Sequence, residues 1–198
     1  VCLATEIPRP MAVESPQPLG AGFWRGFTPV LLASFQFGLA NSVVFVFLPP
    51  FARYAGLPRV APFYVVYTIM AVAVRFLGGR LADRLERRQV ILPSLIALSA
   101  GILLFSVLRS IWVLVLIAFI NGTAHGFVFP AASALAFDRA PRGARGKALA
   151  MFNTAALAGA MAGAAGFGWL AELVGYRAGF VILGLALAVG SVVFWRKR

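Results

Sequence analysis

Six long runs of uncharged, mostly apolar residues dominate this chain. Each can cross the hydrocarbon core of a bilayer as a helix, which needs roughly 20 apolar residues. The runs span residues 26–52, 60–74 (resuming after a short polar stretch), 89–108, 110–137, 148–171 and 178–195. Because lipid cannot satisfy backbone N–H and C=O groups, and because the runs lack the alternation of barrel strands, they must be helices. The sequence therefore predicts an all-α, polytopic membrane protein.

The composition excludes an ordinary water-soluble domain. Hydrophobic residues make up 61% of the chain and charged residues only 12%, against about 25% charged in typical soluble proteins. Six buried helices would have almost no polar covering in water.

The basic residues predict the orientation of the helices. If the N-terminus is cytoplasmic, thirteen of the 18 Lys and Arg residues fall on the inner side. These are Arg9, Arg25, Arg80, Arg84, Arg87, Arg88, Arg139, Arg142, Arg145, Lys147, Arg196, Lys197 and Arg198. The outer segments hold Arg53, Arg59, Arg109 and Arg177, and Arg75 lies near the inner end of the second helix. The positive-inside rule then predicts that both termini face the cytoplasm. We expect the chain to be integral to the plasma (inner) membrane.

A net charge of +12 would suggest nucleic acid in a soluble domain. Here the cations are divided among short loops, so topology and anionic lipid explain them and no nucleic-acid partner is expected. With Cys2 as the only cysteine and His125 as the only histidine, one chain offers neither a disulfide framework nor a Cys/His metal site. We expect no metal, no cofactor and no catalytic residues.

The chain divides into three parts. Residues 1–22 are rich in proline and polar residues and are predicted to form a flexible cytoplasmic linker. Residues 23–195 form the transmembrane domain, and residues 196–198 a basic cytoplasmic tail. Pro49 and Pro50 are predicted to end or break the first helix. The absence of Met at position 1 suggests that the chain begins within a longer protein.

An internal repeat relates the two halves of the membrane domain. Residues 79–88 are echoed by 168–177 at an offset of 89 positions, each reading G-x-L-A, an acid, and then an arginine five residues later. Three helices separate the copies, so one copy lies inside and the other outside. This is the arrangement of a 3+3 inverted-topology repeat.

Four polar residues in the runs are candidates for the wall of a substrate cavity. The offset superposes Gln36 on His125, both near the middle of a predicted helix, where a polar side chain is costly unless it faces a partner or a watery cavity. Asn121 lies one turn before His125, and Asn41 lies on the first helix. The alternative is that these groups only form hydrogen bonds between helices.

The fifth run is rich in Gly and Ala, with Gly159 and Gly163 in a G-x-x-x-G spacing and Ala155 one step earlier. Small residues allow close helix approach in lipid. The stripe predicts a helix interface, either within this bundle or with a further domain.

The segment 79–88, GRLADRLERR, resembles the G-x-L-a-D-r-x-G-r-r/k signature of the major facilitator superfamily, and Glu86 replaces the usual Gly. Similarity to the C-terminal half of an efflux-type member extends over about residues 23–195, including the Arg142–Gly146 loop. The resemblance implies a transporter of two six-helix halves. In it, helices one and four line the cavity, two and five contact the other half, and three and six lie outside. This favours a further domain as the partner of the fifth helix.

The signature also suggests a conformational latch. Asp83 can pair with Arg75, Arg84 or Arg87 and accept hydrogen bonds from the inner N-terminus of the fifth helix, where a carboxylate is stabilised by about 0.3 to 1 kcal/mol. We assign Gly79 and Arg88 to the same element. Helices that separate during rocking would break the contact.

The leading hypothesis is transport of a small molecule by alternating access, as the C-terminal half of a secondary active exporter. Its expected partners are the lipid bilayer, the small-molecule substrate, an N-terminal six-helix half or a second copy of this chain, and protons as the candidate coupling ion. One alternative is a truncated or split membrane domain without transport of its own. Another is an intramembrane hydrolase that uses His125 and Ser133, although the chain has no G-x-S-x-G elbow.

Overall fold

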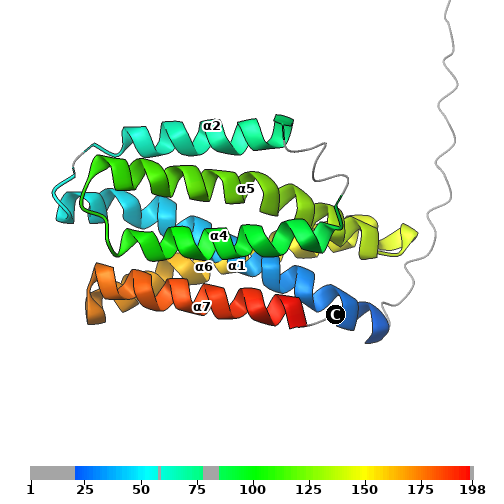
Figure 1. Ribbon diagram of the computed structural model, residues 1–198. Coiled ribbons are helices and arrows are strands. Elements are labelled where there is room, and N and C mark those ends of the chain that lie inside the picture. Colours follow the sequence, from blue (N-terminus) through cyan, green and yellow to red (C-terminus); the bar gives the residue numbers. More distant parts are fainter. Residues whose placement is uncertain (1–20, 58, 78–84, 197–198) are drawn as a thin grey trace, which may run out of the picture.

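The computed structural model describes residues 21–57, 59–77 and 85–196, and each apolar run forms a helix there (Figure 1). In chain order the elements are α1 (Ala21–Tyr54), α2 (Ala61–Leu77), α4 (Arg87–Phe105), α5 (Ile111–Arg139), the 3-10 helix η1 (Arg142–Ala144), α6 (Arg145–Val174) and α7 (Tyr176–Arg196). Five described helices are long and apolar enough to cross a membrane, and α2 is a shorter apolar helix. The predicted all-α membrane fold is confirmed. The proposed linker lies almost entirely outside the described residues.

The prediction that Pro49 and Pro50 end the first helix is wrong, because α1 continues to Tyr54. The extra turn is held by packing. Phe51 is fully buried, and its ring centroid lies 5.0 Å from that of Phe180 on α7. A proline removes a backbone donor but leaves its carbonyl, and near a helix end this loss is smaller than the gain from burying an aromatic ring.

Short turns join α4 to α5 and α6 to α7. Ser110 caps the start of α5, where its hydroxyl accepts a hydrogen bond from the Val113 N–H at 3.4 Å. Gly175 alone separates α6 from α7 and has a φ of +81°, a conformation that favours glycine. Turns this short make helices that are consecutive in sequence run antiparallel.

The helix pairs follow the predicted repeat. If the first repeat is α1, α2 and α4, the second is α5, α6 and α7. The most extensive packing joins α1 to α6 and α2 to α5, and α4 packs along both α5 and α7 (Figure 1). The repeat relates α1 to α5 and α2 to α6, so the pair α1·α6 corresponds to the pair α5·α2. In each repeat, the first helix therefore packs against the second helix of the other repeat.

Glycines allow both pairs to approach closely. A Cβ added at Gly159 or Gly163 on α6 would collide with backbone carbonyls of Phe35 or Leu39 on α1. On α5, a Cβ at Gly122 would likewise meet the Tyr67 carbonyl of α2. The sequence favoured a further domain as the partner of the small-residue stripe, but Gly159 and Gly163 face α1 of the same bundle. Ala155, one turn earlier, is half-buried.

Candidate functional site

A chain of polar contacts joins α1, α2 and α5 near the middle of their spans. The buried Tyr67 donates its hydroxyl hydrogen to Asn41 Oδ1 at 2.8 Å, and its oxygen lies 2.6 Å from His125 Nδ1. A hydroxyl has one hydrogen, so Nδ1 of His125 is the donor in the second contact. In the neutral imidazole this leaves Nε2 as an acceptor.

Aromatic rings surround this chain. The Phe37 ring meets His125 edge to face, with centroids 4.9 Å apart, and Phe45 meets Tyr67 in the same way at 5.2 Å. Asn41 and His125 are only half-buried. A mostly apolar wall with a few fixed polar groups is the usual composition of a small-molecule site. We call Asn41, Tyr67 and His125 the tyrosine cluster.

A cation lies beyond the tyrosine cluster on α2. Arg75 follows Tyr67 by eight residues, about two helical turns, and is exposed. Arg75 was assigned to the latch from sequence, and the structure places it in the last turn of α2.

The other two cavity candidates lie at contacts between helices. Gln36 is 4% exposed and donates to Ser191 Oγ at 2.9 Å and to the Leu187 carbonyl, both on α7. Asn121 is 1% exposed and donates to the Ile117 carbonyl of its own helix. The structure therefore brings Asn41 and His125 together and places Gln36 and Asn121 elsewhere.

Gln36 and Asn121 occupy equivalent places in the two repeats. A Cβ at Gly190 on α7 would meet the Gln36 carboxamide, and a Cβ at Gly101 on α4 would meet the Asn121 carboxamide. Gly101 and Gly190 are 89 positions apart. The structure therefore makes Gln36 equivalent to Asn121. The sequence superposition had paired Gln36 with His125, which lies one helical turn after Asn121.

Two arginines at the same offset make matching contacts at opposite ends of the α4·α7 pair. Arg88, in the first turn of α4, donates to the Phe194 carbonyl in the last turn of α7 at 3.0 Å. Arg177, in the first turn of α7, donates to the Ser106 and Leu108 carbonyls just past α4. Carbonyls at helix ends lack intrahelical donors. The repeated arginine thus caps the end of its partner helix in both copies.

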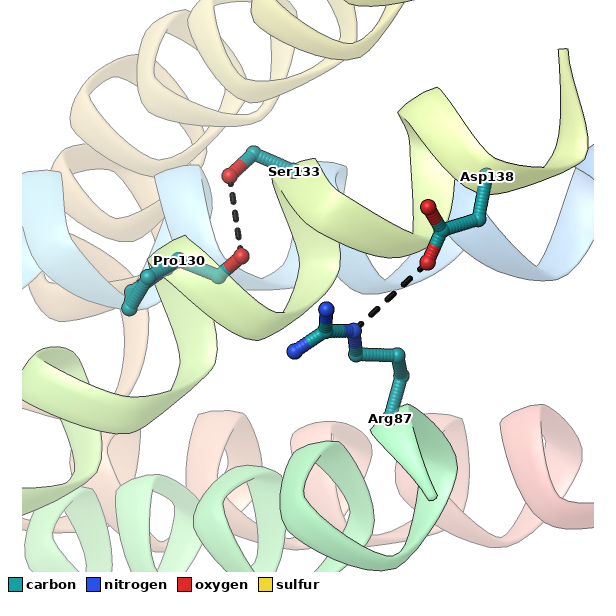
Figure 2. Close-up of polar contacts among 4 residues, drawn as sticks. All are labelled: Arg87, Pro130, Ser133 and Asp138. Carbon is teal, nitrogen blue, oxygen red and sulfur yellow. Dashed lines mark hydrogen bonds and ion pairs between the residues drawn. The ribbon is translucent and has the colours of Figure 1, made fainter. Parts of the chain in front are cut away.

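At the predicted inner end, the described part of the latch shows a different ion pair. Arg87 Nε lies 3.6 Å from Asp138 Oδ2 at the end of α5, with both side chains substantially exposed (Figure 2). Such a pair contributes about 0 to 1 kcal/mol. Asp83, Gly79 and Arg84 lie outside the described residues.

The hydrolase alternative required His125 to act on Ser133. In the structure the Ser133 hydroxyl donates to the Pro130 carbonyl of the same helix at 3.0 Å (Figure 2). His125 is engaged with Tyr67 instead. Among the described residues, no three His, Cys, Asp or Glu side chains gather where they could hold a metal ion.

Tyr67 is the site residue that sequence reasoning missed. Its signal was present, since a tyrosine hydroxyl in the middle of an apolar run needs a partner in lipid. Tyrosine is also common at membrane interfaces, and the helix bounds alone did not show its depth.

Comparison with known proteins decides the family. The model of the Major Facilitator Superfamily matches residues 30–198. The chain belongs to the major facilitator superfamily. It is 32% identical over 195 residues to the "Multidrug resistance protein MdtG" of Citrobacter koseri, which covers 93% of this chain and 48% of that protein. The protein of the same name from Salmonella typhi is 30% identical, covering 88% of this chain and 45% of the relative.

Membership in the superfamily and the apolar helices make the chain an integral membrane protein. It spans about half the length of the curated relatives that it matches.

Proposed function

We propose that this chain is one six-helix half of a secondary transporter that exports small molecules by alternating access. Three findings support the proposal: the family, relatives named as multidrug resistance proteins, and a match to only half of their length. The observation that supports a substrate site is the tyrosine cluster, in which polar groups from three helices meet among aromatic rings. Its half-buried members are the substrate-contacting residues in this proposal.

The second half of the transporter would cover α2 and α6. A much smaller part of α6 than of α1 is buried inside the bundle. Leu157 and Met161 on α6, and Val65 and Ile69 on α2, are exposed. These side chains supply an apolar face for either an N-terminal half or a second copy of the chain. Placement in the plasma (inner) membrane with both termini in the cytoplasm is part of the same proposal.

We also propose that residues 79–88 form a latch that holds one conformation of the alternating-access cycle. Arg87 and Asp138 would hold the predicted inner ends of α4 and α5 in one state. Protons are the proposed coupling ion.

The test is dye export by the complete coding sequence in a bacterial strain that lacks its own exporters. The native protein should lower the accumulation of a fluorescent dye, and a proton ionophore should abolish the effect. His125→Ala removes one side chain of the cluster and should reduce export roughly five- to tenfold, since a hydrogen bond contributes about 1 kcal/mol. Ser133→Ala is the control on the same helix and should export normally.

Membrane abundance of each variant is measured by immunoblot, so that loss of protein is not read as loss of export. Native protein that accumulates in the membrane but leaves dye levels equal to those of the empty vector would contradict the transport proposal. Full export by His125→Ala would remove the tyrosine cluster from it.

A further inference from the structure

The tyrosine cluster leaves one acceptor atom and one donor atom unused. Within it, the Tyr67 hydroxyl donates to Asn41 Oδ1 and accepts from His125 Nδ1. These bonds leave His125 Nε2 as an acceptor, and Asn41 Nδ2 with two hydrogens to donate. Neither atom has a hydrogen-bond partner in the described part of the chain, and neither is among the buried atoms there that lack one. Both atoms are therefore open to the surface of the bundle.

The two open atoms lie deep in the membrane domain and close together. His125 is the central residue of α5, and the cluster joins it to the middle parts of α1 and α2. Only the Tyr67 hydroxyl separates the side chains of Asn41 and His125. One small polar group of a ligand can therefore meet both atoms, provided that it carries a donor beside an acceptor.

Aromatic rings lie on both sides of the cluster. The Phe37 ring contacts those of His125 and Phe129, with centroids 4.9 and 5.6 Å apart. On the other side, the Phe45 ring meets that of Tyr67 at 5.2 Å. Phe45 is 38% exposed and Phe129 is half-buried, so aromatic surface is available beside the polar atoms. Such a surface favours a ligand with an aromatic ring of its own.

No carboxylate accompanies these groups in the part of the chain that the structure describes. The described acids lie at helix ends: Glu86 before α4, Asp138 in the last turn of α5, and Glu172 in the last turn of α6. The one charge on α2 is the cation Arg75. A cationic ligand would have no countercharge from this half of the transporter, and an unpaired charge is costly in the membrane. The cluster therefore suits a neutral group.

We propose that the tyrosine cluster binds the neutral carboxamide group of an aromatic compound. The carboxamide N–H would donate to His125 Nε2, its carbonyl would accept from Asn41 Nδ2, and the ring would pack beside Phe45. A quaternary ammonium ion offers neither a donor nor an acceptor, and a carboxylate offers acceptors alone, so both leave His125 Nε2 unmatched. The inference rests on the proposed function and names the class of its substrate.

The experiment measures competition against dye uptake into inside-out membrane vesicles that contain the complete protein. Three probes are compared: a naphthalene carboxamide, its N,N-dimethyl derivative without an N–H, and a naphthylmethyl trimethylammonium ion with a fixed charge. The carboxamide should inhibit uptake at a concentration about tenfold lower than either of the other two, because each of these lacks at least one of the two hydrogen bonds.

Two variants test the two atoms separately. In His125→Asn the new NH₂ group still donates to the Tyr67 hydroxyl, but no atom replaces Nε2, so the carboxamide should lose its advantage over the dimethyl derivative. Asn41→Asp keeps the acceptor for Tyr67 and replaces the donor by a negative charge, so the ammonium probe should become the stronger competitor. Ser133→Ala, on α5 outside the cluster, should keep the native order.

Fluorescence anisotropy of the probes with purified protein in detergent gives their affinities without transport, which extends the comparison to variants that no longer take up dye. Equal binding of the carboxamide and its dimethyl derivative by the native protein would overturn the inference, even where dye uptake is intact. An advantage of the carboxamide that persists in His125→Asn would do so as well. Dye uptake no greater than in empty-vector vesicles, with the carboxamide preference intact in detergent, would contradict the transport proposal alone and support the assigned ligand class.

Discussion

At the scale of single residues, the hydroxyl group of Tyr67 connects three helices by hydrogen bonds. Tyr67 on α2 is hydrogen-bonded to Asn41 on α1 and to His125 on α5, and its ring is buried while both partners are half-buried. Hydrogen bonds between membrane helices contribute about 0.6 kcal/mol on average. The arrangement therefore fixes the orientation of His125 more than it stabilises the bundle.

Tyr67→Phe should separate these two effects. Removing the hydroxyl loses both contacts and should cost about 1 kcal/mol, or roughly 2 to 4 °C in unfolding temperature for a chain of this size. Dye export should fall more sharply, because His125 loses the group that orients it. Unfolding in detergent and export in cells are the two measurements.

Tyr64→Phe is the control on the same helix. The described contacts of Tyr64 are made by its ring, which packs against Phe45 and Phe63. Both its stability and its export should remain near native. Equal loss of export in the two variants would show that any change in this aromatic surrounding has the same effect.

At the scale of elements, sequence could predict the helices but not their neighbours. An uncharged run in lipid has no other stable backbone structure, so the helices follow from their length and apolarity. Core and lipid-facing side chains are both apolar, however, and the runs do not show which face is which. Gln36 and His125 therefore looked equivalent, although one meets α7 and the other meets α2.

Gly159→Ala should destabilise the α1·α6 pair. The added methyl would press on the Phe35 backbone, and overpacking of this kind costs about 1 to 3 kcal/mol. Gly166→Ala, on the same helix, meets nothing within 4 Å and should be neutral or stabilising. Unfolding temperatures of the two variants give the comparison. Similar values would show that α6 does not pack on α1 in this register.

Arg177→Gln tests the reciprocal caps. It should cost up to about 2 kcal/mol, because the carbonyls past α4 lose a charged donor at a helix C-terminus. Arg109→Gln removes an exposed charge from the same end and should cost little. Chemical denaturation in mixed micelles would compare them, and equal midpoints would mean that the cap is without energetic effect.

At the scale of the whole molecule, the basic residues predict which end of the bundle faces the cytoplasm. Single cysteines at Ser110 and Lys147, introduced in a Cys2→Ser background, should lie on opposite sides. A membrane-impermeant maleimide should label position 110 in intact cells and position 147 only after permeabilisation. Labelling of both positions in intact cells would reject the predicted topology.

The exchange of partners between the repeats also bears on how the protein is made. Ser34 on α1 donates to the Phe152 carbonyl on α6, a residue 118 positions later in the chain. When α1 emerges from the ribosome, α6, the helix with which it packs most extensively, has not yet been synthesised. The carbonyls past the end of α4 likewise lack their donor until Arg177 has been made. Each group of three helices therefore lacks its main packing partners until the helices of the other group are present.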